Sequence, residues 1–105
     1  MNPGISFDPD KSQRNELERG LPFTWVQEME WGTTLIKEDT RKDYGERRFL
    51  AMGKIQGRLH AVVFTPRNDK VHVISLRKAN AREIQHYEHT QNSAQANRHL
   101  SLIHI

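Results

Sequence analysis

Three apolar segments separated only by short turns constrain this chain most. Gln56-Gly57 separates the first segment, which begins at Arg47, from the second, and Pro66-Arg67-Asn68-Asp69 separates the second from the third, at residues 71–79. Residues of these types between apolar runs are typical of hairpin turns. Because connections this short join antiparallel neighbours, the pattern predicts a three-stranded meander.

The middle segment carries the strongest burial signal. Residues 59–64 are apolar at every position except His60, which predicts a central strand covered on both faces. Side chains alternate between the faces of a strand. Arg77 and Lys78 are therefore expected to leave the third strand in opposite directions. In a meander the first and third strands run parallel, so Arg48 at the start of one and Arg77 at the end of the other are expected at opposite ends.

Helix signals precede the sheet. Asp8, Pro9 and Gly20 predict a first helix over residues 9–19, with Leu17 among its few apolar anchors. A second short helix is predicted from about Pro22 to Glu30, followed by a short strand over residues 33–37. The evidence for this second helix is the spacing of its apolar residues, Phe23, Val26 and Met29.

A last helix is predicted after the sheet. Asn80 and Glu83 form a variant of the capping box, with Ile84 and Tyr87 on the buried side. The predicted fold class is α+β: two N-terminal helices, a small antiparallel sheet and a C-terminal helix. Residues 1–90 are expected to form a single domain, and residues 91–105 a polar tail with an apolar end that is either flexible or docks on a partner.

Several classes of protein are disfavoured. No cysteine is present, so disulfides and thiolate metal sites are excluded. No signal peptide or membrane span is evident, and a cytoplasmic protein without a cofactor is expected. The spacing of Glu83, His86 and His89 fits one helical face, but no further carboxylates stand at matched spacing, and no metal site is predicted.

Charge is distributed unevenly along the chain. Residues 41–82 hold eleven lysines and arginines against three acidic residues, whereas residues 1–40 hold four against eight. Such asymmetry indicates either a polyanionic partner or a solvated basic face. Arginines that only keep the strands soluble are the alternative for each of these residues taken singly.

The reaction that these residues suit is RNA cleavage. Without a metal it requires a base for the 2′-OH proton, an acid for the leaving oxygen and cations around the phosphate. Glu46 is the expected base, and Arg48 and Arg77 the catalytic cations, because the guanidinium fork matches phosphate. Further phosphate contacts are expected from Arg58, Arg67 and Lys78. His60 is a weaker candidate for the acid, since most lone histidines are structural.

An ordered set of short motifs over residues 7–88 resembles the BrnT toxins. Its elements are Phe7-Asp8-Pro9, Gly20, Glu46-x-Arg48, Gly57-Arg58-Leu59, Thr65-x-Arg67 and Ile74-Ser75-x-Arg77-Lys78-Ala79. The resemblance implies a RelE-like ribonuclease fold and the toxin half of a type II toxin–antitoxin pair. It also implies a BrnA-like antitoxin partner with a DNA-binding part, a toxin homodimer within the complex, and binding of operator DNA through the antitoxin.

The chain departs from the family at two places. Arg47 replaces the second acid of the family's Glu-Glu-Arg element, and Glu18-Arg19-Gly20 stands where relatives have Lys-His-Gly. Two hypotheses remain. The first, which the resemblance implies, is a metal-independent endoribonuclease toxin that is neutralised by its antitoxin. The alternative is a catalytically degenerate binding module that only holds an antitoxin on operator DNA.

Overall fold

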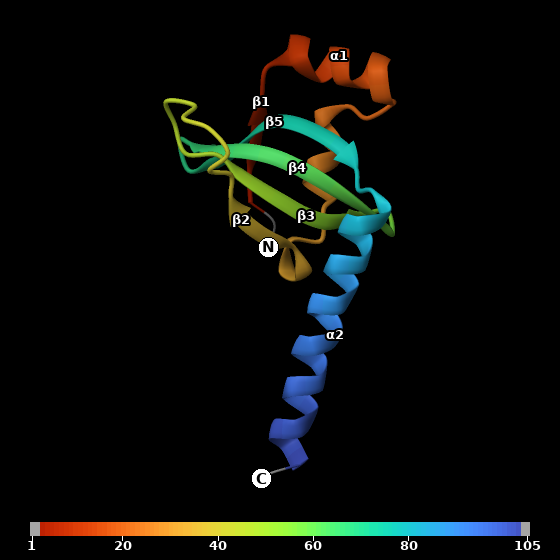
Figure 1. Cartoon of the computed structure of the whole chain (residues 1–105). Coiled ribbons are helices and arrows are strands. Elements are labelled where there is room, and N and C mark those ends of the chain that lie inside the picture. Colours follow the sequence, from red (N-terminus) through yellow and green to blue (C-terminus); the bar gives the residue numbers. More distant parts are fainter. Residues whose placement is uncertain (1–2, 104–105) are drawn as a thin grey trace.

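A five-stranded mixed sheet forms the body of the protein, and a long helix projects from it (Figure 1). The computed structural model describes residues 3–103, with side chains through residue 93. In chain order the elements are β1 (Ile5–Phe7), α1 (Pro9–Arg19), the 3₁₀ helices η1 (Phe23–Glu28) and η2 (Trp31–Thr33), β2 (Leu35–Glu38), β3 (Phe49–Ile55), β4 (Arg58–Arg67), β5 (Lys70–Lys78) and α2 (Ala81–Ile103). The predicted α+β class is confirmed.

The predicted meander is confirmed as β3, β4 and β5. Its two turns contain consecutive residues with positive φ, at Gln56-Gly57 (52° and 78°) and Asn68-Asp69 (54° and 62°). Two-residue turns of this kind match the right-handed twist of the strands that they join. Strand β4 is the middle strand of the sheet and is buried over most of its length, as its apolar pattern predicted.

The sheet is not wholly antiparallel, because β1 adds a fifth strand in parallel beside β5. Ile5, Ser6 and Phe7 pair with Val71, His72 and Val73. The expectation of a small antiparallel sheet was wrong at this edge. The reason is physical: a three-residue strand has little pattern of its own and depends on a partner far along the chain.

Helix α1 has the predicted bounds, but its anchors differ from the prediction. Asp8 caps it, and Gly20 ends it at φ 73°. Leu17 was expected to be an anchor and is instead 80% exposed. The buried residues are polar: Asn15 Nδ2 donates to the carbonyls of Leu21 (2.7 Å) and Leu76 (2.9 Å), and the N–H of Phe23 donates to Ser12 Oγ (2.9 Å). Polar contacts therefore hold α1 against β5 and η1.

The predicted second α-helix is wrong, since this segment forms the 3₁₀ helix η1. Its backbone bonds run from Trp25 to Pro22 and from Met29 to Val26, three residues apart. A 3₁₀ helix has three residues per turn, so the spacing of Phe23, Val26 and Met29 places them on one face. All three are at most 1% exposed.

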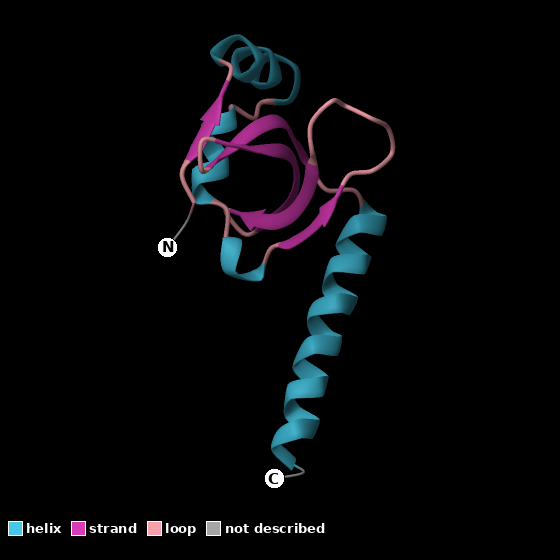
Figure 2. Ribbon diagram, turned by 90° about the vertical axis from the view of Figure 1, so that its left-hand side faces the viewer, coloured by secondary structure: helices cyan, strands magenta, loops and turns pink. Residues whose placement is uncertain are grey.

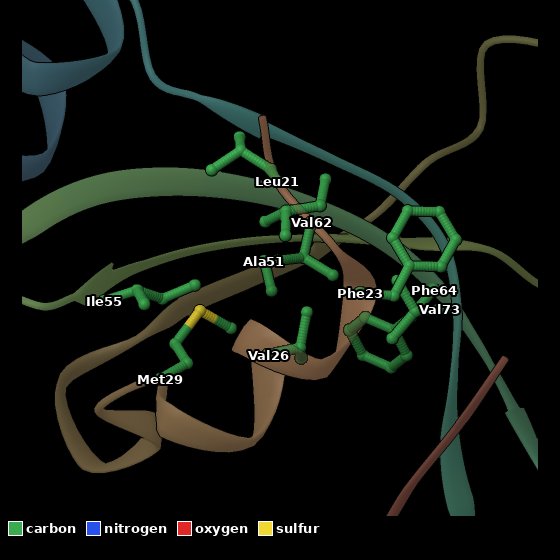
Figure 3. Packing of buried hydrophobic residues seen from close by; sticks show 10 residues of the cluster. Leu21, Phe23, Val26, Met29, Ala51, Ile55, Val62, Phe64 and Val73 are labelled. Atoms are coloured by element: carbon green, nitrogen blue, oxygen red, sulfur yellow. The ribbon is translucent and has the colours of Figure 1, made fainter. Parts of the chain in front are cut away.

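The main core lies between η1 and the inner face of the sheet (Figure 3). Ala51, Ile55 and Val62 form part of the sheet side of this core. Phe7 meets Phe23 edge to face, with ring centroids 6.0 Å apart. A second, smaller cluster lies on the outer face under α2 and consists of Met52, Leu59, Ala79 and Tyr87.

Helix α2 begins with the predicted capping box. The N–H of Glu83 donates to Asn80 Oδ1 (2.8 Å), and the N–H of Asn80 donates to Glu83 Oε1 (2.9 Å). The helix then runs away from the sheet (Figures 1 and 2). It continues past residue 90, where a polar tail was expected. The predicted partner contacts of the apolar end lie outside the residues whose side chains are described.

Within residues 3–103, no helix is both long and apolar enough to cross a membrane.

Candidate functional site

The outer face of the sheet carries a cleft of about 610 Å³. Its floor is formed by Leu50, Val63 and Ser75, from three adjacent strands. Its walls hold four cationic side chains, Arg19, Lys37, Arg41 and Arg77, and three carboxylates, Glu38, Asp39 and Glu83. The cleft thus has β3, β4 and β5 as its floor and is surrounded by α1, by β2 with the loop that follows it, and by α2.

Arg77 is fixed in this cleft by Glu83. Its Nη1 and Nη2 donate to the two oxygens of Glu83, each at 2.8 Å, and Nη1 also lies 3.4 Å from the carbonyl of Lys78. The hydrogen bonds from Arg77 lower the pKa of Glu83 to about 2, so this carboxylate stays charged at neutral pH. The Nε–H of Arg77 has no partner among the described residues and remains available to an anion.

Two further arginines of the cleft were missed by the sequence prediction of the site. Arg19 Nη1 donates to Asn15 Oδ1 (3.3 Å) and to the carbonyl of Leu76 (3.2 Å), which brings the end of α1 to the cleft. Arg41 forms a two-pronged ion pair with Asp39, both contacts being 2.8 Å, and thereby holds the pKa of Asp39 well below its usual range. No local sequence signal places either arginine beside β5.

A second group of charged residues lies in a neighbouring hollow, which we call the loop hollow because the segment 38–48 lines it. The cleft and the loop hollow share the residues Glu38, Asp39 and Thr40. Asp39 and Thr40 belong to the long loop between β2 and β3, which Figure 2 shows beside the sheet. The two hollows are therefore adjacent parts of one surface.

The loop hollow contains Glu46 and Arg48. One oxygen of Glu46 pairs with Arg67 Nη2 at 3.2 Å, and the Glu46 side chain is 33% exposed. The guanidinium of Arg48 lies 4.2 Å from the centre of the Tyr44 ring, and its Nε is buried without a partner. The hydroxyl of Thr65 donates to the carbonyl of Arg47 (2.7 Å), which ties the end of the loop to β4.

The structure separates the six predicted site residues. Arg77 lies in register with Ala61 and Met52, four residues along β3 from Arg48, which corresponds to roughly 13 Å along the strand. The expected separation of Arg48 and Arg77 is confirmed. Arg58 is exposed at the β3–β4 turn, and Lys78 is in register with His60, away from the cleft. Glu46, Arg48 and Arg67 lie together, whereas Arg77 lines the cleft.

The histidine that was weighed as an acid is a core residue. His60 is 1% exposed, and its Nδ1–H donates to the carbonyl of Arg58 (2.7 Å). Its ring lies edge to face with Trp25, and burial lowers its pKa. His60 therefore lies in the core on the inner face, away from the Glu46–Arg67 pair. Among the described residues no group of three histidine, cysteine or acidic side chains is arranged to hold a metal ion.

Comparison with known proteins identifies the family. A family model described as the ribonuclease toxin BrnT of type II toxin–antitoxin systems matches residues 7–83. A comparison with curated proteins found no match. The matched region spans strands β2 to β5, both arginines of the predicted catalytic set, and Glu46, but only the last residue of β1. The chain therefore belongs to the BrnT family of ribonuclease toxins.

Proposed function

We propose that this toxin cleaves RNA by metal-independent transesterification, with its reaction centre at Glu46, Arg48 and Arg67 in and beside the loop hollow. The family supplies the reaction class, a ribonuclease. The observation that carries the proposal is the one-point ion pair between Glu46 and Arg67. It leaves one carboxylate oxygen of Glu46 able to accept a proton beside a guanidinium that can hold a phosphate.

Each residue has a defined part in the reaction. Glu46 removes the proton from a ribose 2′-OH, and the resulting oxygen attacks the adjacent phosphorus. Arg67 and Arg48 stabilise the extra negative charge on the phosphate oxygens in the transition state. The P–O5′ bond then breaks, which leaves a 2′,3′-cyclic phosphate on one fragment and a 5′-hydroxyl on the other.

The cleft extends this site along the RNA. Arg77 is held rigidly by Glu83, and its unpaired Nε–H gives it a remaining donor for a phosphate oxygen. Because Arg77 and Glu46 line different hollows, we assign them to different nucleotides. Arg77 and Arg19 bind the backbone that flanks the cleaved linkage.

The proposed partners of this protein are those that membership of the family implies. A type II toxin acts within a toxin–antitoxin pair. We propose a BrnA-like antitoxin as the protein partner, a toxin homodimer within the complex, and contact with operator DNA only through the antitoxin. RNA is the substrate.

A second candidate function rests on Arg19. A guanidinium stays protonated in proteins and neither gives nor takes a proton during catalysis. Arg19 lines the cleft at the position where relatives resembling this chain have histidine. If the reaction requires a titrating group there, the protein is a binding module that only holds its antitoxin on operator DNA.

Incubation with RNA in the presence of a chelator separates the two functions. The purified toxin, free of antitoxin, is expected to cut RNA in excess EDTA and to leave fragments with 2′,3′-cyclic phosphate and 5′-hydroxyl ends. End-group analysis of the fragments measures both features. RNA that remains intact with and without added Mg²⁺ would support the binding module, whereas cleavage that requires Mg²⁺ would contradict metal independence.

Replacing Arg77 with alanine is expected to weaken RNA binding by roughly 10- to 100-fold, because a hydrogen bond to a charged group contributes about 1.5–3 kcal/mol. Arg77→Lys keeps the charge but loses the planar guanidinium fork, so its affinity for RNA should lie between those of the wild type and of Arg77→Ala. Lys78→Ala is the matched control, since Lys78 leaves the cleft. Affinity for a non-cleavable 2′-deoxy oligonucleotide provides the measurement. Equal losses in Arg77→Ala and Lys78→Ala would contradict the assignment.

A further inference from the structure

His72 lies on the outer face of the sheet, at the same end as Glu46. On β5 it is in register with Thr65 of β4 and Ser6 of β1. Its neighbours along the strand, Val71 and Val73, pack on the core side. Alternation therefore turns His72 toward the face that carries the loop hollow. The ring is half-buried rather than enclosed.

Charged groups from several elements surround the ring. Arg67 of β4, Glu46 of the loop, Lys11 of α1 and the cap residue Asp8 all lie close enough to act on it electrostatically. Two of these, Glu46 and Arg67, form the ion pair of the proposed reaction centre. Thr65, the cross-strand partner of His72, shares one face of β4 with Arg67, so His72 lies near the Glu46–Arg67 pair, whereas His60 is on the other side of the sheet.

The orientation of the ring is set by a single hydrogen bond. Its Nδ1 lies 2.9 Å from Ser6 Oγ. When the imidazole is protonated, Nδ1–H donates to Ser6 and Nε2–H is the second donor. Nε2 makes no hydrogen bond within residues 3–93. A general acid needs such an arrangement: one nitrogen held in place, and the other free to give its proton.

We propose that His72 is the general acid that protonates the leaving 5′-oxygen, an inference that rests on the proposed ribonuclease function. In one step the 2′-oxygen forms a bond to phosphorus while its proton passes to Glu46, and the P–O5′ bond breaks while the Nε2 proton passes to the 5′-oxygen. Glu46 gains one proton and His72 loses one. Exchange with water restores both groups before the next turnover.

The surroundings of His72 set the direction of its pH dependence. Burial lowers the pKa of His72, and Arg67 acts in the same direction, while Glu46 opposes them. A bound phosphate brings negative charge and favours the imidazolium. Because the acid must be protonated to act, cleavage is expected to slow as the pH rises through the pKa of His72 in the RNA complex.

The decisive experiment compares two leaving groups on the full-length toxin. One substrate is an oligonucleotide with a single cleavable ribonucleotide and its natural 5′-oxygen linkage. The second carries sulfur in place of that 5′-oxygen. A thiol has a pKa of about 8.5, so a thiolate leaves without protonation. His72→Asn is tested beside His86→Asn, a histidine exposed on α2 that serves as the matched control.

We expect His72→Asn to cleave the natural linkage about 10²-fold more slowly. It should cleave the sulfur linkage within about threefold of the wild-type rate, which also shows that the variant is folded. The decline of the rate at high pH should disappear. Equal losses on both linkages, or an unchanged rate on the natural one, would overturn the assignment of His72. Failure of the wild-type protein to cut either substrate would instead overturn the proposed ribonuclease and this inference together.

Discussion

Glu46→Gln is expected to reduce RNA cleavage by roughly 10²–10⁴-fold, the usual contribution of a positioned base. Glutamine keeps the shape of the side chain, and its amide oxygen still accepts a hydrogen bond from Arg67. It cannot take the 2′-OH proton. The loss should appear in kcat, with little change in affinity for a 2′-deoxy oligonucleotide, because the substitution removes proton transfer rather than a phosphate contact.

The stability of this variant should change little. The Glu46–Arg67 pair is substantially exposed, with 33% and 49% of the two side chains accessible, and such pairs contribute about 0–1 kcal/mol. Glu16→Gln on the exposed side of α1 is the matched control. Single-turnover cleavage and thermal unfolding of both variants are the measurements. If Glu46→Gln retained more than about a tenth of the wild-type kcat, Glu46 would not be the base.

Gly53→Ala is expected to destabilise the fold by about 2–3 kcal/mol, because it inserts a methyl group where no space exists. A β-carbon at Gly53 would lie 2.8 Å from Sδ and 2.9 Å from Cγ of Met29, and would collide with Oγ1 of Thr34. Met29 is fully buried beneath the sheet. Either η1 must move away from β3 or the strand must shift, and both disturb the main core.

Gly32→Ala provides the matched control, since a β-carbon at Gly32 meets nothing within 4 Å. Thermal unfolding followed by circular dichroism should show a midpoint roughly 10–20 °C lower for Gly53→Ala. A midpoint for Gly53→Ala equal to that of Gly32→Ala would mean that η1 does not pack on β3 as closely as described.

The parts of the fold that were predicted correctly are those encoded in neighbouring residues. Helix α1 begins after Asp8 and ends at Gly20, Asn80 and Glu83 cap the start of α2, and Gln56-Gly57 forms a hairpin turn. Each of these signals works through the local backbone. The errors concern contacts between distant segments, since β1 needs β5 to become a strand. Likewise, α1 is held by Asn15 reaching Leu76 rather than by the apolar Leu17.

The same distinction between local signals and long-range contacts applies to the candidate site. Strand alternation correctly separated Arg77 from Lys78, and the meander correctly separated Arg77 from Arg48. The sequence did not predict that Arg19 reaches the cleft from the end of α1, because that position depends on how α1 packs on β5. Nor did it distinguish His60 from His72. Both lie on strands, and only the register and the β1 pairing show which of them lies on the outer face.

The pairing of β1 with β5 also determines when the hydrogen bond between Ser6 and His72 can form during synthesis of the chain. Ser6 and His72 are 66 residues apart in the chain, yet they share one hydrogen bond. The ribosome makes β1 first, and no parallel partner exists until β5 has been translated and has left the exit tunnel. Parallel pairings over such separations form slowly, since a long loop must close first. A nascent chain therefore lacks the hydrogen bond that orients the proposed general acid, His72, until β5 can pair with β1.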